Sequence, residues 1–211
     1  MAKQTWVKIF GEWKEIKSMW MRIGGTWKED VMPYVRVSGV WKECMSYVEP
    51  IPSNANIGDD FGGGKVAYIG SEFPVMGGMI CHSDVGWDYD TTTRQWGCRG
   101  TTVGLDGTLL GTGYANTEAA VTHACNMESD KAPRICWDTD TGGYTDWFLP
   151  SLNELNELYL NKSTLDGFAA DWYWSSSESS SRFARFRSFT YGFQYLSFKS
   201  SAYKLRAVRG F

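Results

Sequence analysis

The stretch that decides the fold of this 211-residue chain runs from Gly142 to Tyr159 and reads GGYTDWFLPSLNELNELY. Its second half predicts an α-helix from Pro150 to Leu160, because Ser151 and Glu154 form a capping-box pattern that satisfies free backbone N–H groups at a helix start. The apolar residues recur at helical spacing on one side, and they are Leu152, Leu155, Leu158 and Tyr159. We expect this side of the helix to lie in the core.

The flanking sequence predicts one more helix and several strands. Asn116 to Cys125 begins at a favourable capping residue and carries small apolar residues at helical spacing. From Trp172 onward, aromatic and β-prone runs alternate with Gly and Ser clusters, which is typical of strands joined by exposed loops. The run from Trp174 to Ser181 has the composition of a flexible linker, but its aromatic flanks favour an ordered turn in which the serines and Glu178 bond to local backbone. These segments therefore predict a domain that contains both helices and strands.

The first 48 residues contain an internal repeat with a period of 14 residues. Its three copies are WVKIFGEWKEIKSM, WMRIGGTWKEDVMP and YVRVSGVWKECMSY. In each copy a β-prone run meets a two-residue loop and leaves through Trp-Lys-Glu, which indicates a β-hairpin. We expect an all-β module of three hairpins that form a small meander. Because such a module cannot bury its Trp rows alone, it is expected either to self-associate or to extend the main domain.

Two further segments complete the predicted organisation. Residues 49–57 contain two prolines and small polar residues, and they are interpreted as a linker. Residues 58–211 form the larger domain. An apolar content of 43% and an aromatic content of 16% are sufficient for a sizeable core.

Composition and charge exclude several classes of protein. The net charge of -3 argues against general nucleic-acid binding, which needs a basic surplus. No apolar run reaches the roughly 18 residues of a membrane-spanning helix, so no membrane insertion is expected. The start of the chain lacks the charged and apolar pattern of a signal peptide, so we expect it to be made in the cytoplasm of a host cell without one.

The five cysteines stand at irregular spacings, at Cys44, Cys81, Cys98, Cys125 and Cys136. We expect free, mostly buried thiols. A disulfide between Cys125 and Cys136 is the alternative in an oxidising environment.

Catalytic and metal sites are not expected. Asp138–Asp146 and Asp84–Asp90 are acidic loops that resemble calcium loops only in part, since a closing Glu is missing, and Asx-turns without bound metal or cofactor are favoured. His82 is the better catalytic candidate of the two histidines, but no nucleophile, base and orienting group can be assembled around it. We therefore expect no enzyme.

Spaced motifs extend along residues 58 to 211. They include DFGGGKVAY from Asp60, the stretch from Gly142 to Tyr159, YWSSSE from Tyr173 and the final LRAVRGF. Together they resemble the Lcl C-terminal-type domain of bacterial and phage proteins. This resemblance implies a C-type-lectin-like fold of the α+β class and a role in adhesion. The Gly-x-Trp-Lys-Glu repeats resemble those of phage tail proteins. The calcium-dependent sugar site of true lectins is not implied, because neither Glu-Pro-Asn nor Gln-Pro-Asp occurs.

The terminal segment resembles the variable regions of diversity-generating retroelement target proteins, where Asn codons become mainly Phe, Ser, Tyr, Arg, Leu, Thr or Ala. From Ser179 to Tyr203 the chain has almost only these types, with Gln194 and Lys199 among the exceptions. An aromatic strand region that is not diversified is the alternative. The resemblance implies a ligand-binding surface formed by Arg182, Phe183, Arg185, Arg187, Ser188, Thr190, Tyr191, Phe193, Tyr195, Ser197, Phe198 and Tyr203.

These features lead to an expected function. We expect a receptor-binding or adhesion protein at the tip of a phage tail fibre, located in the virion and assembled as a homo-oligomer, with a trimer considered. Its partner is expected to be a host cell-surface receptor, either a protein or an anionic glycan, because seven Arg and Lys but no Asp or Glu follow Glu178. The alternatives are an enzyme on the similar fold of sulfatase-modifying enzymes and a purely structural fibre module.

Overall fold

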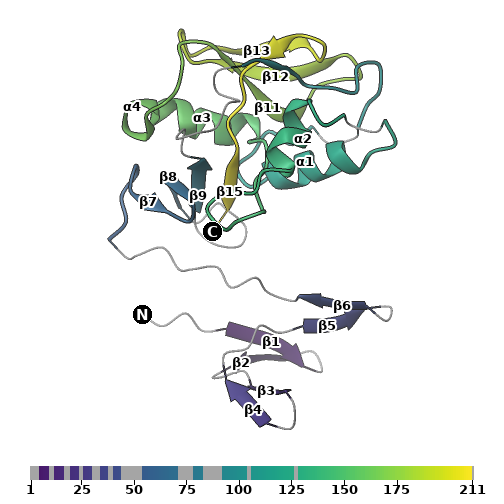
Figure 1. Cartoon of the computed structure of the whole chain (residues 1–211), viewed down its shortest axis with the longest axis vertical. Helices are drawn as coiled ribbons and strands as arrows, with labels where there is room; N and C mark the ends of the chain where they lie inside the picture. The colour runs from purple at the N-terminus through teal and green to yellow at the C-terminus, as the bar shows by residue number, and fades with distance from the viewer. Residues whose placement is uncertain are drawn as a thin grey trace. The chain divides into compact units, whose positions relative to one another are not determined.

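The computed structural model describes residues 54–70, 78–82, 92–103, 106–125 and 128–210, together with the backbone of six strands between Thr5 and Glu43. The chain forms two units, Met1–Val48 and Glu49–Phe211 (Figure 1). Within the described residues, no helix is long and apolar enough to cross a membrane. Cys44, most of the predicted linker and the loop Asp84–Asp90 lie outside the described residues.

Three antiparallel hairpins make up the first unit, and two residues separate the strands of each, where the repeats predict loops. The pairs are β1 (Thr5–Ile9) with β2 (Glu12–Ile16), β3 (Trp20–Ile23) with β4 (Thr26–Glu29), and β5 (Tyr34–Val37) with β6 (Val40–Glu43). Each hairpin is a separate two-stranded sheet. The described strands pair within each hairpin, and pairing between hairpins, as in a single meander sheet, is not seen among them. The Trp side chains of this unit lie outside the described residues, so self-association stays a prediction.

Helices and sheets together build the second unit, so the protein is α+β. One sheet has the order β15-β9-β8-β7, and its strands are β7 (Asp60–Phe61), β8 (Gly64–Ile69), β9 (Gly78–His82) and β15 (Val208–Gly210). The second sheet has the order β11-β12-β13, with β11 (Trp172–Glu178), β12 (Phe183–Ser188) and β13 (Gln194–Phe198). A two-stranded ribbon pairs β10 (Arg94–Gln95) with β14 (Ala202–Tyr203).

The strongest sequence prediction, the helix after Pro150, is confirmed as α3 (Leu152–Leu160). Ser151 caps it, because its hydroxyl accepts a hydrogen bond from Glu154 N while the Glu154 carboxylate accepts one from Ser151 N. Leu155 and Leu158 are fully buried, and α3 contacts strands of both larger sheets (Figure 1). The helix thus joins the two sheets through one core, as its apolar side predicts.

The other helices depart from the sequence prediction. They are α1 (Gly113–Thr122), α2 (Ala132–Trp137) and α4 (Lys162–Leu165), of which α2 and α4 were not predicted. The predicted capping residue Asn116 lies inside α1, because its side-chain amide is buried and donates to Gly107 O and Ser176 Oγ. Asn116 therefore joins distant segments and does not start the helix.

The serine run divides between a buried strand in its first half and the predicted turn in its second half. Ser175, Ser176 and Ser177 lie in β11 and are at most 1% exposed. The Ser177 hydroxyl donates to Gly107 O and accepts from Leu152 N, so its partners are far away in the sequence. The predicted bonding to local backbone is therefore wrong for Ser177. It is confirmed for Ser180, whose hydroxyl accepts hydrogen bonds from Arg182 N and Phe183 N. The turn comes later, between Glu178 and Phe183.

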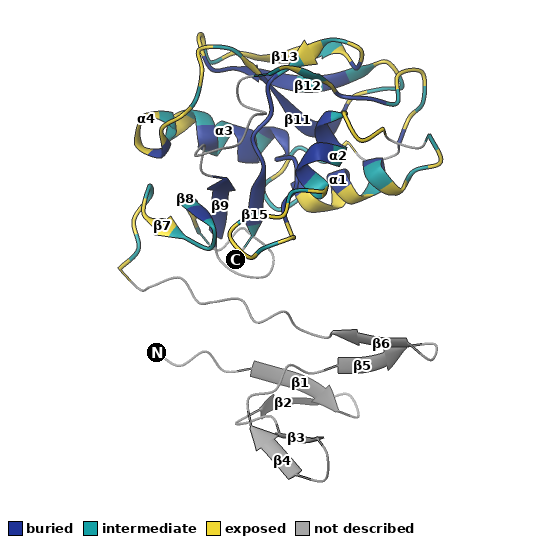
Figure 2. Cartoon of the chain, viewed as in Figure 1, coloured by how far each residue is buried: buried dark blue, intermediate teal, exposed yellow. Residues whose placement is uncertain are grey.

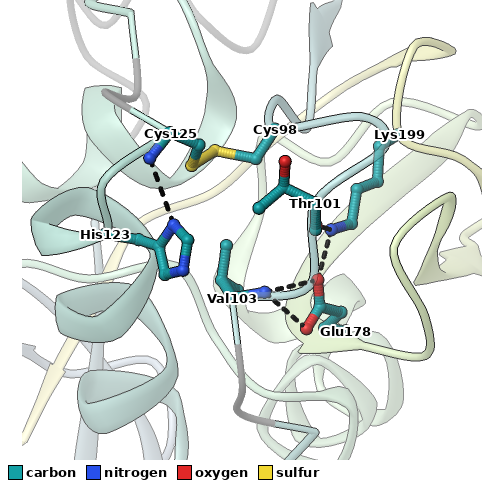
Figure 3. Close-up of a disulfide and its surroundings, with 7 residues drawn as sticks. All are labelled: Cys98, Thr101, Val103, His123, Cys125, Glu178 and Lys199. Atoms are coloured by element: carbon teal, nitrogen blue, oxygen red, sulfur yellow. Dashed lines mark hydrogen bonds and ion pairs between the residues drawn. A yellow bond between two sulfur atoms is a disulfide. The ribbon is translucent and has the colours of Figure 1, made fainter.

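A disulfide joins Cys98 to Cys125, with a Cα–Cα distance of 5.8 Å (Figure 3). Cys81 and Cys136 are free and buried. The expectation of free thiols is therefore wrong for Cys98 and Cys125, and the alternative pairing with Cys136 is wrong as well. The spacing of the cysteines could not predict this disulfide, because the two partners are 27 positions apart and only the fold brings them together. The bond ties the segment after β10 to the end of α1.

Breaking this disulfide is expected to lower the free energy of unfolding by about 2–4 kcal/mol, because the closed loop restricts the unfolded chain. The double variant Cys98→Ser/Cys125→Ser should melt at the same temperature as the reduced wild-type protein. Calorimetry of both proteins with and without a reductant measures this. A wild-type melting temperature that ignores the reductant would contradict the prediction.

Candidate ligand-binding surface

The register of the sheet β11-β12-β13 determines which side chains lie on each of its two faces. Trp174 lies opposite Phe186, and Phe186 opposite Tyr195. Directly paired residues point to the same side of a sheet, so these three side chains share one face, called here the aromatic face. The residues between them point the other way. That second face, called here the arginine face, carries Arg185 and Arg187 on β12.

Exposure increases across this sheet from β11 to β13 (Figure 2). All but the first residue of β11 are buried, whereas most of β13 is exposed. Tyr195 is 71% exposed, although it lies directly opposite the buried Phe186. The edge strand is therefore the part of the sheet that displays side chains.

The aromatic face holds a contiguous cluster of rings, called here the aromatic cluster. The Tyr203 ring lies 5.1 Å from Trp172, 4.9 Å from Phe186 and 4.6 Å from Trp174, measured between ring centroids. Phe193 lies 6.2 Å from Phe186. Trp174 and Phe186 form the buried floor, while Trp172 and Phe193 are 41% and 45% exposed. The cluster thus offers ring surface that is supported from below.

The turn between β12 and β13 extends this cluster. Gly192, at a positive φ of 80°, donates through its N–H to Ser188 O, and Tyr191 N donates to the Ser188 hydroxyl. A side chain at position 192 would also meet the Tyr159 hydroxyl, so glycine suits this turn on both counts. The turn holds Tyr191, 77% exposed, with its ring parallel to that of Phe193. Backbone contacts therefore order a residue whose side chain is free to meet a ligand.

A second exposed group lies on the arginine face, at the other end of the hairpin. Phe183 and Phe198 stack with 4.6 Å between their centroids, and the guanidinium of Arg99 lies 5.5 Å from the Phe198 ring. Gly100 N donates to Ser181 O and connects the Arg99 segment to the hairpin. Arg185 is two residues from Phe183 on the same strand, so it adjoins this stack.

Two residues predicted to bind ligand are not displayed, and the prediction is wrong for them. Arg187 is 6% exposed, and its guanidinium lies 4.2 Å from the Tyr159 ring of α3. Burial lowers the pKa of Arg187. Ser188 is fully buried, and its hydroxyl holds the turn. These neighbouring residues point to opposite faces of β12, and both are covered by protein.

The remaining predicted residues divide between several places. Phe193, Tyr195, Ser197 and Tyr203 lie on or beside the aromatic face, and the Ser197 hydroxyl lies 2.8 Å from that of Tyr203. On the arginine side are Phe183, Arg185 and Phe198. Arg182, Thr190 and Tyr191 are exposed in the two turns that flank β12.

The cationic end of the chain is mostly internal. Five of its seven basic residues are buried, namely Arg187, Lys199, Lys204, Arg206 and Arg209. Lys199 pairs with Glu178, and Arg209 pairs with Asp146 through both of its carboxylate oxygens. Arg206 donates to the carbonyl oxygens of His82 and Gly167. Only Arg182 and Arg185 of this set retain exposed surface.

Sequence reasoning missed three members of this surface. Trp172 is in the aromatic cluster, and Phe186 forms part of its floor. Trp172 is two residues from Trp174, and Phe186 is two residues from Ser188. Residues two apart on a strand point to the same face, so this spacing could have indicated which residues share a face. Arg99 gave no signal, because it is far from Phe198 in the sequence and only the fold brings its guanidinium over that ring.

Groups that could support catalysis or metal binding are engaged in structural contacts. His82 is 4% exposed and packs edge-on against Trp147, with 5.0 Å between ring centroids. Burial raises the pKa of Cys136, which disfavours the reactive thiolate. Asp138 pairs with Arg134, and Asp146 with Arg209. Across the part of the chain that the structure describes, no group of three or more His, Cys, Asp or Glu is placed to hold a metal ion.

A scan against models of protein families finds no match to this chain, and a search of curated proteins finds no significantly similar sequence. The surface must therefore be interpreted from its own residues.

Proposed function

We propose that this protein is a non-enzymatic recognition protein that binds its ligand through the aromatic cluster and the neighbouring turn. The proposal includes a C-type-lectin-like fold for residues 58–211 and a role as a receptor-binding protein of a phage tail fibre, carried in the virion. The partner is a host cell-surface receptor. The first unit, with its three hairpins, is proposed to assemble several copies.

One observation carries this proposal. Tyr191, Phe193 and Tyr195 are between 45% and 77% exposed on the turn and edge strand β13. Trp172, which is 41% exposed on β11, is linked to them through the ring of Phe186. Large exposed apolar patches on soluble proteins commonly mark interaction sites. Tyr and Trp are favoured in such sites because they provide a large contact area for little loss of conformational entropy.

The resemblance of the terminal segment to diversified variable regions supports the same proposal. The positions that it marks as variable include the most exposed rings, Tyr191 and Tyr195. The α+β fold with a β-rich terminal region is compatible with a C-type-lectin-like domain. No observation favours the enzyme or the structural module more specifically.

The triple variant Tyr191→Ser/Phe193→Ser/Tyr195→Ser is expected to lose most ligand binding while it keeps its fold. Truncation of an aromatic hot spot typically costs about 2 kcal/mol or more of binding free energy. Exposed substitutions change stability by only about 0.5 kcal/mol each. Binding of the labelled full chain to a panel of bacterial cells, measured by flow cytometry, and thermal melting test the two halves of the prediction.

A matched control replaces the same number of exposed apolar residues elsewhere. Ile69, Leu109 and Leu160 are 44%, 65% and 61% exposed, and their joint change to Ser should leave cell binding intact. Equal loss of binding in both variants would refute a specific role of the aromatic cluster. A large fall in the melting temperature of the first variant alone would show that its rings belong to the core.

A further inference from the structure

The outer edge of β13 has free backbone groups. β13 is the last strand of its sheet, and within the described residues no strand pairs with its outer side. Ser188 N donates to Phe193 O, and Lys199 N donates to Arg182 O. Because bonded and non-bonded pairs alternate along an antiparallel ladder, Tyr195 and Ser197 also bond to β12. The peptide groups of Gln194 and Leu196 consequently point to the open edge.

The side chains along this edge do not cover it. Gln194, Tyr195, Leu196 and Phe198 are all exposed. The edge has neither a Pro nor a charged residue, the usual devices that prevent another strand from pairing. Only the Phe198 carbonyl is taken, by a hydrogen bond from Ser201 N. Gln194 and Leu196 thus present unblocked backbone groups, which are flanked by the exposed side chains of Tyr195 and Phe198.

Charge near this edge is positive on one face. Arg99 lies over the Phe198 ring, and Arg185 is directly opposite Leu196. The Arg185 Nε atom is buried and has no hydrogen-bond partner. On the other face, Tyr195 stands between Phe193 and Ser197 and has no charged residue next to it on β13. The two sides of the edge therefore favour different side chains.

We propose that the β13 edge binds an extended polypeptide segment of the partner by strand addition, with acidic side chains on the arginine face and apolar side chains on the aromatic face. An added strand alternates its side chains between the two faces of the sheet. Acidic residues at every second position then meet Arg99 and Arg185, and the apolar residues between them meet Tyr195. This inference rests on the proposed recognition function and specifies the chemistry of its ligand.

A second copy of this chain fits the edge less well. Pairing of two β13 strands would bring two sets of Arg99 and Arg185 to one interface, where like charges are destabilising. An acidic segment removes that repulsion. An anionic glycan would satisfy the arginines but has no peptide groups to complete the ladder.

The probe for this proposal is the fluorescein-labelled peptide Glu-Val-Glu-Val-Glu-Val-Glu with blocked ends. We expect it to bind the full-length protein and to slow amide hydrogen exchange at Gln194 and Leu196, while exchange at Tyr195 and Ser197 stays unchanged. The same peptide with every amide N-methylated keeps its charge but cannot complete the ladder, and it should not bind. A version with Lys in place of Glu should not bind either.

Two substitutions of one residue separate backbone from side chain. Leu196→Pro removes an outward N–H and leaves the bonds to β12 in place, as is tolerated on edge strands. It should weaken peptide binding by about ten-fold. Leu196→Ala also shortens the side chain but keeps the N–H. It should change peptide affinity by no more than about three-fold. Thermal melting establishes that both variants are folded.

Several outcomes would overturn the inference. They are failure of the Glu-Val peptide to bind, binding of the N-methylated peptide with equal affinity, and unchanged exchange at Gln194 and Leu196 in the complex. A wild-type dimer that Leu196→Pro dissociates would assign the edge to self-association instead. Binding of heparin without any change in exchange at these two amides would assign the arginines to glycans. If cell binding still depends on the aromatic cluster in these cases, the proposed function stands and only strand addition is rejected.

Discussion

Trp174→Ala is expected to lower the free energy of unfolding by about 3–5 kcal/mol, the usual effect of truncating a fully buried large aromatic residue. Trp174 has no exposed surface, and its indole N–H donates to Arg94 O across 80 positions of the sequence. Its ring also packs against Tyr203 and Phe186. The substitution removes the floor of the aromatic cluster and the contact that joins β11 to β10.

Trp172 provides a control of the same residue type on the same strand. It is 41% exposed, so Trp172→Ala should cost far less stability while it weakens ligand binding. Urea unfolding of both variants, followed by circular dichroism, measures the difference. Equal destabilisation by the two substitutions would show that the exposed rim and the buried floor have been assigned wrongly.

Lys199→Met is expected to lower the free energy of unfolding by about 3–5 kcal/mol, because it leaves the Glu178 carboxylate buried without its cation. Lys199 and Glu178 form an ion pair in which both side chains are almost fully buried (Figure 3). Lys199 Nζ also donates to Thr101 O and lies 4.6 Å from the Trp96 ring. Burial lowers the pKa of Lys199, and the ion pair opposes this effect.

An exposed ion pair supplies the comparison. Lys65 pairs with Asp60, whose side chain is 86% exposed, so Lys65→Met should cost no more than about 1 kcal/mol. The double variant Lys199→Met/Glu178→Gln should recover part of the loss, because the amide carries no charge and its oxygen can still accept from Val103 N. Chemical denaturation of the four proteins tests this order. If Lys199→Met lowers the free energy of unfolding by less than about 1 kcal/mol, the predicted role of the buried ion pair is refuted.

Local sequence signals predicted the elements whose stabilisation is local. The capping box at Ser151 and Glu154 and the leucines that follow are local to one helix, so α3 could be predicted together with its cap. The two-residue loops of the hairpins are local in the same sense. Asn116 shows the opposite case, because a favourable capping residue is held by partners 9 and 60 positions away.

The recognition surface was only partly predictable because exposure depends on which elements cover each face. Arg185 and Arg187 have the same residue type and strand, yet α3 covers only the second. Tyr195 and Phe186 are opposite each other on one face, yet only the edge residue is exposed. Register and covering elements are tertiary properties, so neither residue type nor alternation alone separates these pairs.

The position of β15 has a consequence for how the protein is made. The strand pairs with β9, so Val208 lies opposite Cys81, and Val208 also exchanges both backbone hydrogen bonds with Phe148. The sheet that begins near Asp60 is therefore completed by a strand at the other end of the same unit. Contacts so distant in sequence slow folding, and a nascent chain that lacks them exposes β9 as an unpaired edge. We therefore expect this unit to fold only after Gly210 has left the ribosome. Until then, chaperones can protect the open edge of β9.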